Sequence, residues 1–254
     1  MNETMSYSHF KTFRDKIVVI TGGTSGIGYQ MVRLLSPYNT LLVVSRPGEK
    51  LDALEKEFPS INTYQADLSK PTEYETLVHD ILQNHPKIDV LINNAAIQYC
   101  PEFLDDDFAY ETITYEVNLN LVSICALSYL LLPALLNEKS ESVIANINSG
   151  LALAPKTGSA VYCATKSAMN AFSQSLGYQL ENTNVRVTQA FLPLVDTPMT
   201  QGRGKGKLSP ERAAMDIICG IEKGLSVNNI GKVKLLYFLA IFAPWLARKI
   251  MKGS

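Results

Sequence analysis

KIVVITGGTSGIG, at residues 16–28, carries the strongest fold signal in this chain of 254 residues. Its first part, residues 16–20, is a short run rich in β-branched residues, which is typical of a buried strand in a parallel sheet. A helical pattern follows, with Met31, Leu34 and Leu35 on one apolar face. A strand, a glycine-rich turn and a helix in this order form the layout in which backbone amides and a helix N-terminus bind a pyrophosphate. A glycine-rich loop without such a role is the less favoured alternative.

The three glycines of this turn have separate predicted roles. Gly22 permits a tight turn, Gly26 lets the backbone approach the phosphates, and Gly28 lets the helix lie close to the sheet. The residues between them complete the predicted dinucleotide-binding turn: Thr24, Ser25 and Ile27.

The end of the second expected strand, residues 40–45, bears on the choice of cofactor. A unit that binds NAD usually carries an acidic residue here, about 20 residues after the glycines, to hold the ribose 2′-hydroxyl. This chain has Ser45 followed by Arg46. A guanidinium can make charge-assisted hydrogen bonds to a 2′-phosphate, and no carboxylate would repel that phosphate. The pattern predicts NADP, with NAD as the alternative; an arginine on a surface loop without this role is the less favoured interpretation.

Strands and helices alternate through most of the chain. Further strands are expected at residues 62–66, 90–92, 142–147 and 185–191, and helices at 49–58, 71–84, 108–136 and 159–180. This alternation predicts an α/β fold, a Rossmann-type doubly wound parallel sheet in a single domain. We expect a polar N-terminal extension at 1–15, the catalytic domain at 16–231, and an apolar C-terminal segment at 232–254 that packs on the domain or at an interface.

A serine, a tyrosine and a lysine form the candidate catalytic group. Tyr162 and Lys166 are four residues apart, so they share one face of a helix. An ammonium beside a phenol, near a helix N-terminus, favours the phenolate and makes the tyrosine a better acid–base group. Ser149 ends the strand before this helix and could donate a hydrogen bond to the same substrate oxygen. Taken alone, such a pair is more often a solvated helix face.

Composition narrows the functional classes. Apolar residues make up 46% and charged residues 19% of the chain, and the net charge of −1 provides no overall field for nucleic acid. The four cysteines are widely spaced and form no Cys-x-x-Cys pair, which disfavours a metal site and favours a reducing compartment. Residues 1–16 are polar, with no signal-peptide pattern, and no apolar run reaches the length of a membrane span. We therefore expect a cytoplasmic protein without a bound metal.

The motifs together resemble the classical short-chain dehydrogenases/reductases, in particular a bacterial branch of general oxidoreductases. The resemblance runs from about Ile17 to about Gly224 and rests on the glycine turn, Asn93-Asn94-Ala95, and the 13-residue interval between Ser149 and Tyr162. It implies that Tyr162 is the acid–base and that Lys166 also holds the nicotinamide ribose. It further implies that Asn118 anchors a water that leads to Lys166. The remaining implied cofactor contacts are Asp67, Leu68, Asn94, Ala95, Val195 and Thr197.

Three features depart from the family pattern. Ala96 stands where the family often has glycine, and Leu192-Pro193-Leu194 replaces the usual Pro-Gly motif. The family's glycine-rich seventh strand is not evident after Gly231, so the edge of the sheet is not predicted.

These residues predict an NADP(H)-preferring oxidoreductase that transfers a hydride between nicotinamide and a carbonyl or alcohol group of an apolar small molecule. The apolar preference comes from the expected pocket wall: Gln98, Tyr99, Leu151, Leu153, Leu194 and Met199. A non-catalytic dinucleotide sensor and an interaction protein acting through its C-terminal segment are the alternatives. The basic loop at 201–207 is more simply a surface loop than a lid.

Self-association and the C-terminus complete the expectations. A homodimer or homotetramer is predicted, through a helical interface formed by Leu127, Leu130, Leu131, Leu135, Phe172 and Leu176. Residues 235–247 are apolar on every helical face, are interrupted by Pro244, and have basic flanks. Burial against protein is favoured for this run, and contact with a membrane is the less favoured alternative.

Overall fold

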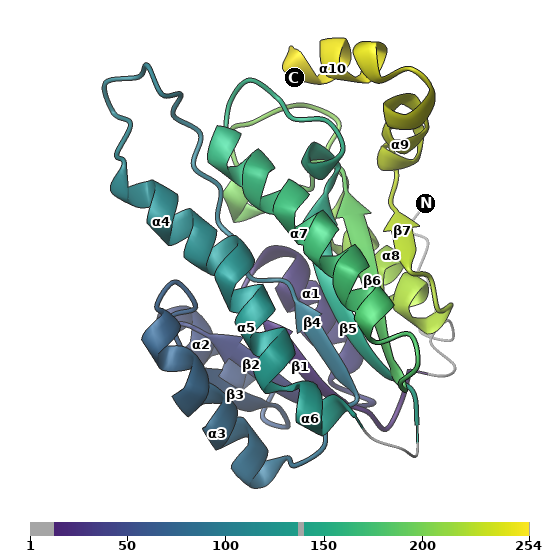
Figure 1. Cartoon of the computed structure of the whole chain (residues 1–254). Coiled ribbons are helices and arrows are strands. Elements are labelled where there is room, and N and C mark those ends of the chain that lie inside the picture. Colours follow the sequence, from purple (N-terminus) through teal and green to yellow (C-terminus); the bar gives the residue numbers. More distant parts are fainter. Residues whose placement is uncertain (1–12, 137–139, 254) are drawn as a thin grey trace, which may run out of the picture.

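The computed structural model describes residues 13–136 and 140–253; most of the predicted N-terminal extension lies outside these ranges. Its centre is a sheet of seven parallel strands in the order β3-β2-β1-β4-β5-β6-β7 (Figure 1). The strand order reverses direction between β1 and β4, which is the doubly wound arrangement predicted from the sequence. The strands are β1 (Ile17–Thr21), β2 (Thr40–Ser45), β3 (Asn62–Gln65), β4 (Val90–Asn93), β5 (Ser142–Ser149), β6 (Val185–Leu192) and β7 (Val227–Asn229).

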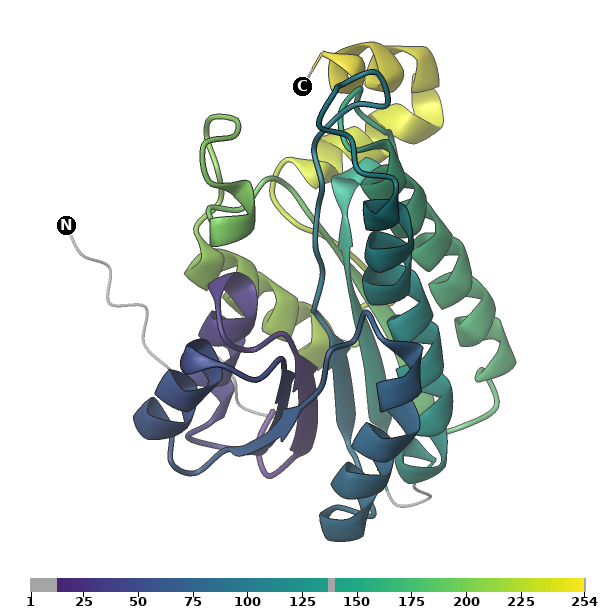
Figure 2. The same cartoon turned by 90° about the vertical axis from the view of Figure 1, so that its left-hand side faces the viewer.

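Helices cover both faces of the sheet, and Figure 2 separates the two layers. One layer contains α1 and α8, and the other contains α3, α5 and α7. Two further helices, α9 and α10, lie at the end of the molecule where the strands terminate. The helices are α1 (Gly26–Leu35), α2 (Glu49–Glu57), α3 (Tyr74–Asn84), α4 (Glu111–Val117), α5 (Ser123–Leu130), α6 (Leu132–Leu135), α7 (Ala160–Gln179), α8 (Pro210–Glu222), α9 (Val233–Phe242) and α10 (Pro244–Lys252).

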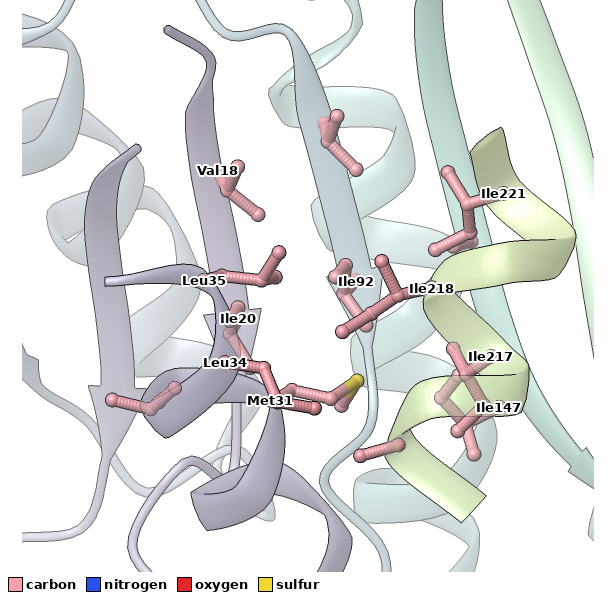
Figure 3. Close-up of a cluster of buried hydrophobic side chains, with 14 of the residues drawn as sticks. Val18, Ile20, Met31, Leu34, Leu35, Ile92, Ile147, Ile217, Ile218 and Ile221 are labelled. Atoms are coloured by element: carbon pink, nitrogen blue, oxygen red, sulfur yellow. The ribbon is translucent and has the colours of Figure 1, made fainter. Parts of the chain in front are cut away.

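Alternate residues of each strand supply the two hydrophobic cores, as the period of two along a strand requires. Val18 and Ile20 of β1 face α1 and α8, where they pack with Met31 and Ile218 (Figure 3). Val19, between them, faces the opposite layer with residues of α3 and α5. Both faces of the central strands are therefore apolar, which explains the uninterrupted β-branched run at the start of the chain.

Glycine is required at two positions of the turn between β1 and α1. Gly22 has a φ of +71°, in the left-handed region that favours glycine, and a Cβ there would lie 2.9 Å from the Cα of Ala95. A Cβ on Gly28 would lie 2.1 Å from the carbonyl oxygen of Gly22. The first glycine thus makes the turn, and the second lets α1 begin against it.

The expected single helix at 108–136 is wrong in detail. The segment forms α4, a π-helical turn at Asn118–Val122, α5 and the short α6, and Pro133 lies in the first turn of α6. A short seventh strand does exist, because β7 pairs with β6 ahead of Gly231. The predicted interruption at Pro244 is confirmed, since α9 ends at Phe242 and α10 begins at Pro244.

Of the six residues proposed for a helical interface, three are internal, and the other three, Leu130, Phe172 and Leu176, are partly exposed. Leu127, Leu131 and Leu135 are at most 1% exposed and belong to the core beneath α5 and α6. They pack between the sheet and α3, so they are not available to a second chain. The large exposed side chains in this layer are instead Tyr129 and Tyr178, each 75% exposed.

Candidate active site

A cleft of about 810 Å³ opens at the carboxyl ends of the strands. Every residue expected to contact the dinucleotide, from Gly22 in the glycine turn to Thr197 after β6, lines this cleft. Ser149, Tyr162 and Lys166 line it as well, whereas Asn118 does not. Residues that are up to 175 positions apart in the chain therefore meet at the switch point of the sheet, where ligands bind in such folds.

The start of α1 suits a phosphate group. Ser25 is the N-cap residue, its side chain makes no capping hydrogen bond, and the first turn of the helix contains no acidic residue. The backbone amides of this turn therefore point into the cleft, and no capping side chain accepts their hydrogen bonds. The turn is held in place by Asn94, whose Nδ2 donates to the carbonyl oxygens of Thr21 at 3.0 Å and Gly22 at 3.1 Å.

The far end of the cleft carries the residues that bear on the cofactor's 2′ position. Ser45 Oγ lies 3.4 Å from Thr24 Oγ1, and Arg46 Nη1 donates to the Tyr115 hydroxyl at 3.0 Å. Thr24, Ser45 and Arg46 all line the cleft, and the side chain at position 45 is a hydroxyl in place of a carboxylate. This end can accept a phosphate without electrostatic repulsion from position 45.

Asp67 lies next to this end and its carboxylate is engaged locally. Its Oδ1 accepts hydrogen bonds from the backbone amide and the hydroxyl of Ser69, at 3.0 and 2.7 Å. Burial acts to raise the pKa of Asp67, but these bonds and the charges of Lys70 and Arg46 outweigh it, so the pKa is lowered overall. Asp67 is thus an ionised residue with a fixed orientation beside the expected adenine site.

Tyr162 occupies the first turn of α7, beside Ser149 at the end of β5. Burial raises the pKa of the phenol above its ordinary value, while a hydrogen bond with the Ser149 hydroxyl acts to lower it. The charge of Glu116 adds to the rise, and that of Arg203 opposes it. The Ser149 hydroxyl also accepts from the amide of Leu151 at 3.2 Å, which orients it toward the cleft.

Lys166 lies one turn further along α7 and is 3% exposed. Its Nζ donates to the carbonyl oxygen of Ile147 at 2.8 Å and lies 5.6 Å from the centre of the Tyr162 ring. Burial lowers the pKa of Lys166 to about 8, and the negative charge of Glu116 opposes that change. The spacing expected from the helical period is confirmed: both side chains reach the same end of the cleft.

A buried polar ladder positions α7 against the sheet. Asn93 Nδ2 donates to Asn146 Oδ1 at 2.8 Å, and Asn146 Nδ2 donates to the Ser173 hydroxyl of α7 at 2.8 Å. Such buried hydrogen bonds have strict geometry and specify one arrangement of the elements. The ladder holds the helix that carries Tyr162 and Lys166 in a single position on β4 and β5.

The structure does not support the expected role of Asn118. Its Nδ2 donates to the carbonyl oxygen of Ser69 at 3.0 Å, on the side of Asp67. Asn120 is fully buried, and its amide bonds both the N–H of Ile97 at 2.9 Å and the carbonyl oxygen of Ile97 at 2.8 Å.

Asn120 also donates to Thr165 Oγ1 at 3.4 Å, next to Lys166. Asn120 rather than Asn118 faces α7 because the segment forms a π-helical turn, and its greater width changes which side chain points to that helix. Of the two amides, Asn120 is therefore the one that contacts the helix carrying the catalytic group.

Glu116 is a second residue that the sequence analysis missed. It is 2% exposed, and its Oε1 accepts from the amide of Tyr99 at 3.3 Å. Burial raises the pKa of Glu116 to about 7, against the opposing effects of the Tyr99 hydrogen bond and the charge of Lys166. The sequence does not reveal that this glutamate is buried, because a glutamate in a helix is usually exposed. In this segment only the amides of Asn118 and Asn120 were considered as functional groups.

The expected substrate wall is partly confirmed. Gln98, Leu151, Leu194 and Met199 line the cleft, and Tyr99 and Leu153 do not. The basic loop at 201–207 forms part of the cleft, because Arg203 lines it. Arg203 Nη1 donates to Gln98 Oε1 at 2.9 Å. This bond crosses the cleft mouth from one wall to the other.

Comparison with known proteins agrees with this architecture. The chain is 36% identical over 185 residues to "Uncharacterized oxidoreductase DltE" of Bacillus subtilis (strain 168), which covers 72% of this chain and 73% of the relative. It is 28% identical over 232 residues to a "Fatty acyl-CoA reductase" of Acinetobacter baylyi, with 88% of this chain and 78% of that protein covered.

In fold it is similar to a short chain dehydrogenase from Burkholderia cenocepacia J2315 solved in complex with NADP. The TM-score is 0.83 at 19% identity, with 94% of this chain and 99% of the other covered. The sequence profile of the short chain dehydrogenase family matches residues 16–208. On its fold, its glycine turn and its serine–tyrosine–lysine cleft, the chain belongs to the short-chain dehydrogenases, the nicotinamide-dependent oxidoreductases of this fold.

Proposed function

We propose that this chain is an NADP(H)-preferring reductase of apolar carbonyl compounds. The observation that carries the proposal is the pair of sites at the two ends of one cleft: Ser149, Tyr162 and Lys166 at one end, and Arg46 beside a hydroxyl residue at the other. Bound nicotinamide would supply or accept the hydride. The residues of the glycine turn, Arg46, Asp67, Asn94 and Lys166 would hold the dinucleotide, and the geometry of the α1 N-terminus fits its phosphates.

The chain's own residues would handle the proton and the oxygen of the substrate. Ser149 would donate a hydrogen bond to the carbonyl oxygen, and Tyr162 would donate the proton as negative charge develops on that oxygen. The raised pKa of Tyr162 keeps the phenol protonated at neutral pH, which is the state that reduction needs.

Several features support an apolar substrate. Leucines from three different segments line the cleft: Leu151, Leu194, and Leu236 with Leu239 of α9. A pocket with an apolar wall and few polar groups selects ligands by burying their apolar surface. The similarity to a protein named as a fatty acyl-CoA reductase points in the same direction. A panel of aliphatic aldehydes and ketones, followed by the loss of NADPH absorbance, would test the proposal; turnover of sugars alone would contradict it.

The preference for NADPH is tested through Arg46. We expect wild-type protein to bind NADPH more tightly than NADH by about 1.5–3 kcal/mol, because charge-assisted hydrogen bonds to the 2′-phosphate are available only to NADPH. Arg46→Ala should remove most of this difference while leaving NADH affinity unchanged. Titration calorimetry with both cofactors measures it, with Arg33→Ala, an exposed arginine of α1, as the control. Equal wild-type affinities would refute the preference.

The exchange of roles between Asn118 and Asn120 is also testable. Asn120→Ala leaves the N–H and the carbonyl of Ile97 without their side-chain partner and loosens the contact with Thr165 beside Lys166. We expect turnover to fall by about tenfold or more, a change of about 1.4 kcal/mol in the barrier. Asn118→Ala removes one bond to Ser69 and should cost less. Steady-state kinetics on both variants decides, and a larger loss for Asn118→Ala would restore the original assignment.

Self-association as a dimer or tetramer and a cytoplasmic location remain predictions. The first loses Leu127, Leu131 and Leu135, which are buried, and keeps the partly exposed Leu130, Phe172 and Leu176; family members commonly associate. The second is supported by the free thiols, since Cys100, Cys125, Cys163 and Cys219 form no disulfide.

A further inference from the structure

Helices α9 and α10 form a hairpin, residues 233–252, with two distinct faces. The inner face packs on the domain: Val233 is 2% and Ala247 is 1% exposed, and a Cβ on Gly150 would come within 3.2 Å of both Val233 and Leu236. Thr157 Oγ1 donates to the carbonyl oxygen of Lys252 at 2.6 Å and ties the far end of the hairpin to the loop before α7. Residues of both helices line the cleft, and the hairpin lies at the end of the molecule (Figure 1).

The outer face of the hairpin is apolar and uncovered. The expected burial against protein therefore holds for the inner face alone. Phe242 is 70% and Trp245 is 68% exposed, at the bend between the helices. Tyr237, Phe238 and Ile241 are also exposed on this face, whereas the exposed Leu235 and Ile250 line the cleft. Phe238 and Phe242 contact each other, with ring centroids 4.6 Å apart. Exposed apolar side chains gathered in this way mark an interaction site in a folded protein.

The charged residues of the hairpin itself are all of one sign. No aspartate or glutamate occurs after Glu222. The cations of this region are Lys232, just before the hairpin, and Lys234, Arg248, Lys249 and Lys252 within it. The chain as a whole has a net charge of −1, so this positive charge is a local feature. A separate loop at the same end of the molecule, before α4, carries Glu102 and three aspartates at 105–107.

These observations discriminate between two occupants. In a two-fold symmetric dimer the same patch meets itself, so a patch with cations alone would face cations. An anionic lipid surface instead offers phosphate groups to the lysines and an apolar layer to the aromatic and aliphatic side chains. Trp and Tyr beside Lys and Arg are the residues that settle at such an interface.

We propose that the α9–α10 hairpin docks this protein onto the surface of an anionic lipid bilayer. Among residues 13–136 and 140–253, no helix is long and apolar enough to cross a bilayer, so the hairpin would lie in the interface plane. Because its inner face lines the cleft, docking brings the cleft mouth to the lipid–water boundary. On the proposed function, this favours substrates that carry an apolar chain.

Trp245 is the only tryptophan of the chain and lies at the centre of the patch, so its fluorescence reports on this surface alone. Full-length protein should cosediment with vesicles of equal parts phosphatidylglycerol and phosphatidylcholine, with a blue shift of the tryptophan emission. Vesicles of phosphatidylcholine alone should bind it much less, and added salt should weaken binding.

Two pairs of variants test the two components of the surface. Lys234→Gln with Lys249→Gln should weaken binding by about fivefold for each lysine removed. The matched control, Lys50→Gln with Lys56→Gln, changes two exposed lysines of α2 at the other end of the fold and should leave binding unchanged. Ile241→Ser with Phe242→Ser should abolish the blue shift, and Tyr129→Ser with Tyr178→Ser should not. Unchanged melting curves would establish that all variants are folded.

Two results would overturn the proposal. The first is that wild-type protein neither sediments with the anionic vesicles nor changes its emission. The second is that the emission shifts without vesicles as protein concentration rises, together with a doubling of mass by light scattering, which would identify a second copy as the occupant.

Discussion

Tyr162→Phe is expected to lower kcat by about 10²–10⁴-fold while the fold and the cofactor affinity are retained. The substitution keeps the aromatic ring, which is 9% exposed in the first turn of α7, and removes only the hydroxyl that forms the hydrogen bond with Ser149. Without that hydroxyl, the cleft has no phenol to protonate the developing alkoxide. Steady-state kinetics with a confirmed carbonyl substrate, together with a cofactor titration, measures both effects.

The matched control is Tyr178→Phe on the same helix, where the side chain is 75% exposed and turnover should be unchanged. This comparison also separates the proposed enzyme from its alternatives. A dinucleotide sensor or an interaction protein would keep its biological activity when Tyr162 is changed, and a wild-type rate in the variant would show that the acid–base assignment is incorrect.

Glu116→Gln is expected to stabilise the protein at alkaline pH. The ordinary pKa of 4.5 for this carboxyl is raised to about 7 in the fold. Between these values the unfolded chain ionises Glu116 while the folded protein keeps it protonated, so the free energy of unfolding falls as pH rises. Above about pH 7 the penalty is constant, at about 3 kcal/mol for the full shift.

The glutamine variant has no such penalty, so its advantage should be near zero at pH 4.5 and largest above pH 8. The gain falls below the full figure because Lys166 loses the negative charge that favours its protonated form. Urea unfolding across this pH range gives the free energies, with Glu111→Gln, an exposed glutamate of the same helix, as the control. An equal difference between variant and wild type at pH 5 and pH 8.5 would contradict the assignment.

Local sequence determined the catalytic and cofactor-binding parts that depend on short-range geometry. The turn at residues 21–28 forms as expected because only glycine tolerates the φ of Gly22 and the contact at Gly28. The side chains of Tyr162 and Lys166 point to the same end of the cleft because four residues make about one helical turn. Ser149 joins them because parallel strands end at the same edge of the sheet. These relations are set by backbone geometry and can be predicted from the chain.

Tertiary packing decided the rest, because burial and orientation depend on segments far apart in the chain. A π-helical turn directs Asn120 in place of Asn118 to Thr165, and sequence periodicity does not reveal that extra width. Leu127 and its neighbours fill the core under α3, where they had been expected at an interface. The C-terminal run folds at Pro244 as predicted, but its outer face is uncovered because the domain offers the hairpin only one surface, the cleft wall. An apolar sequence predicts that a segment is buried. The arrangement of the other elements decides which of its faces is covered.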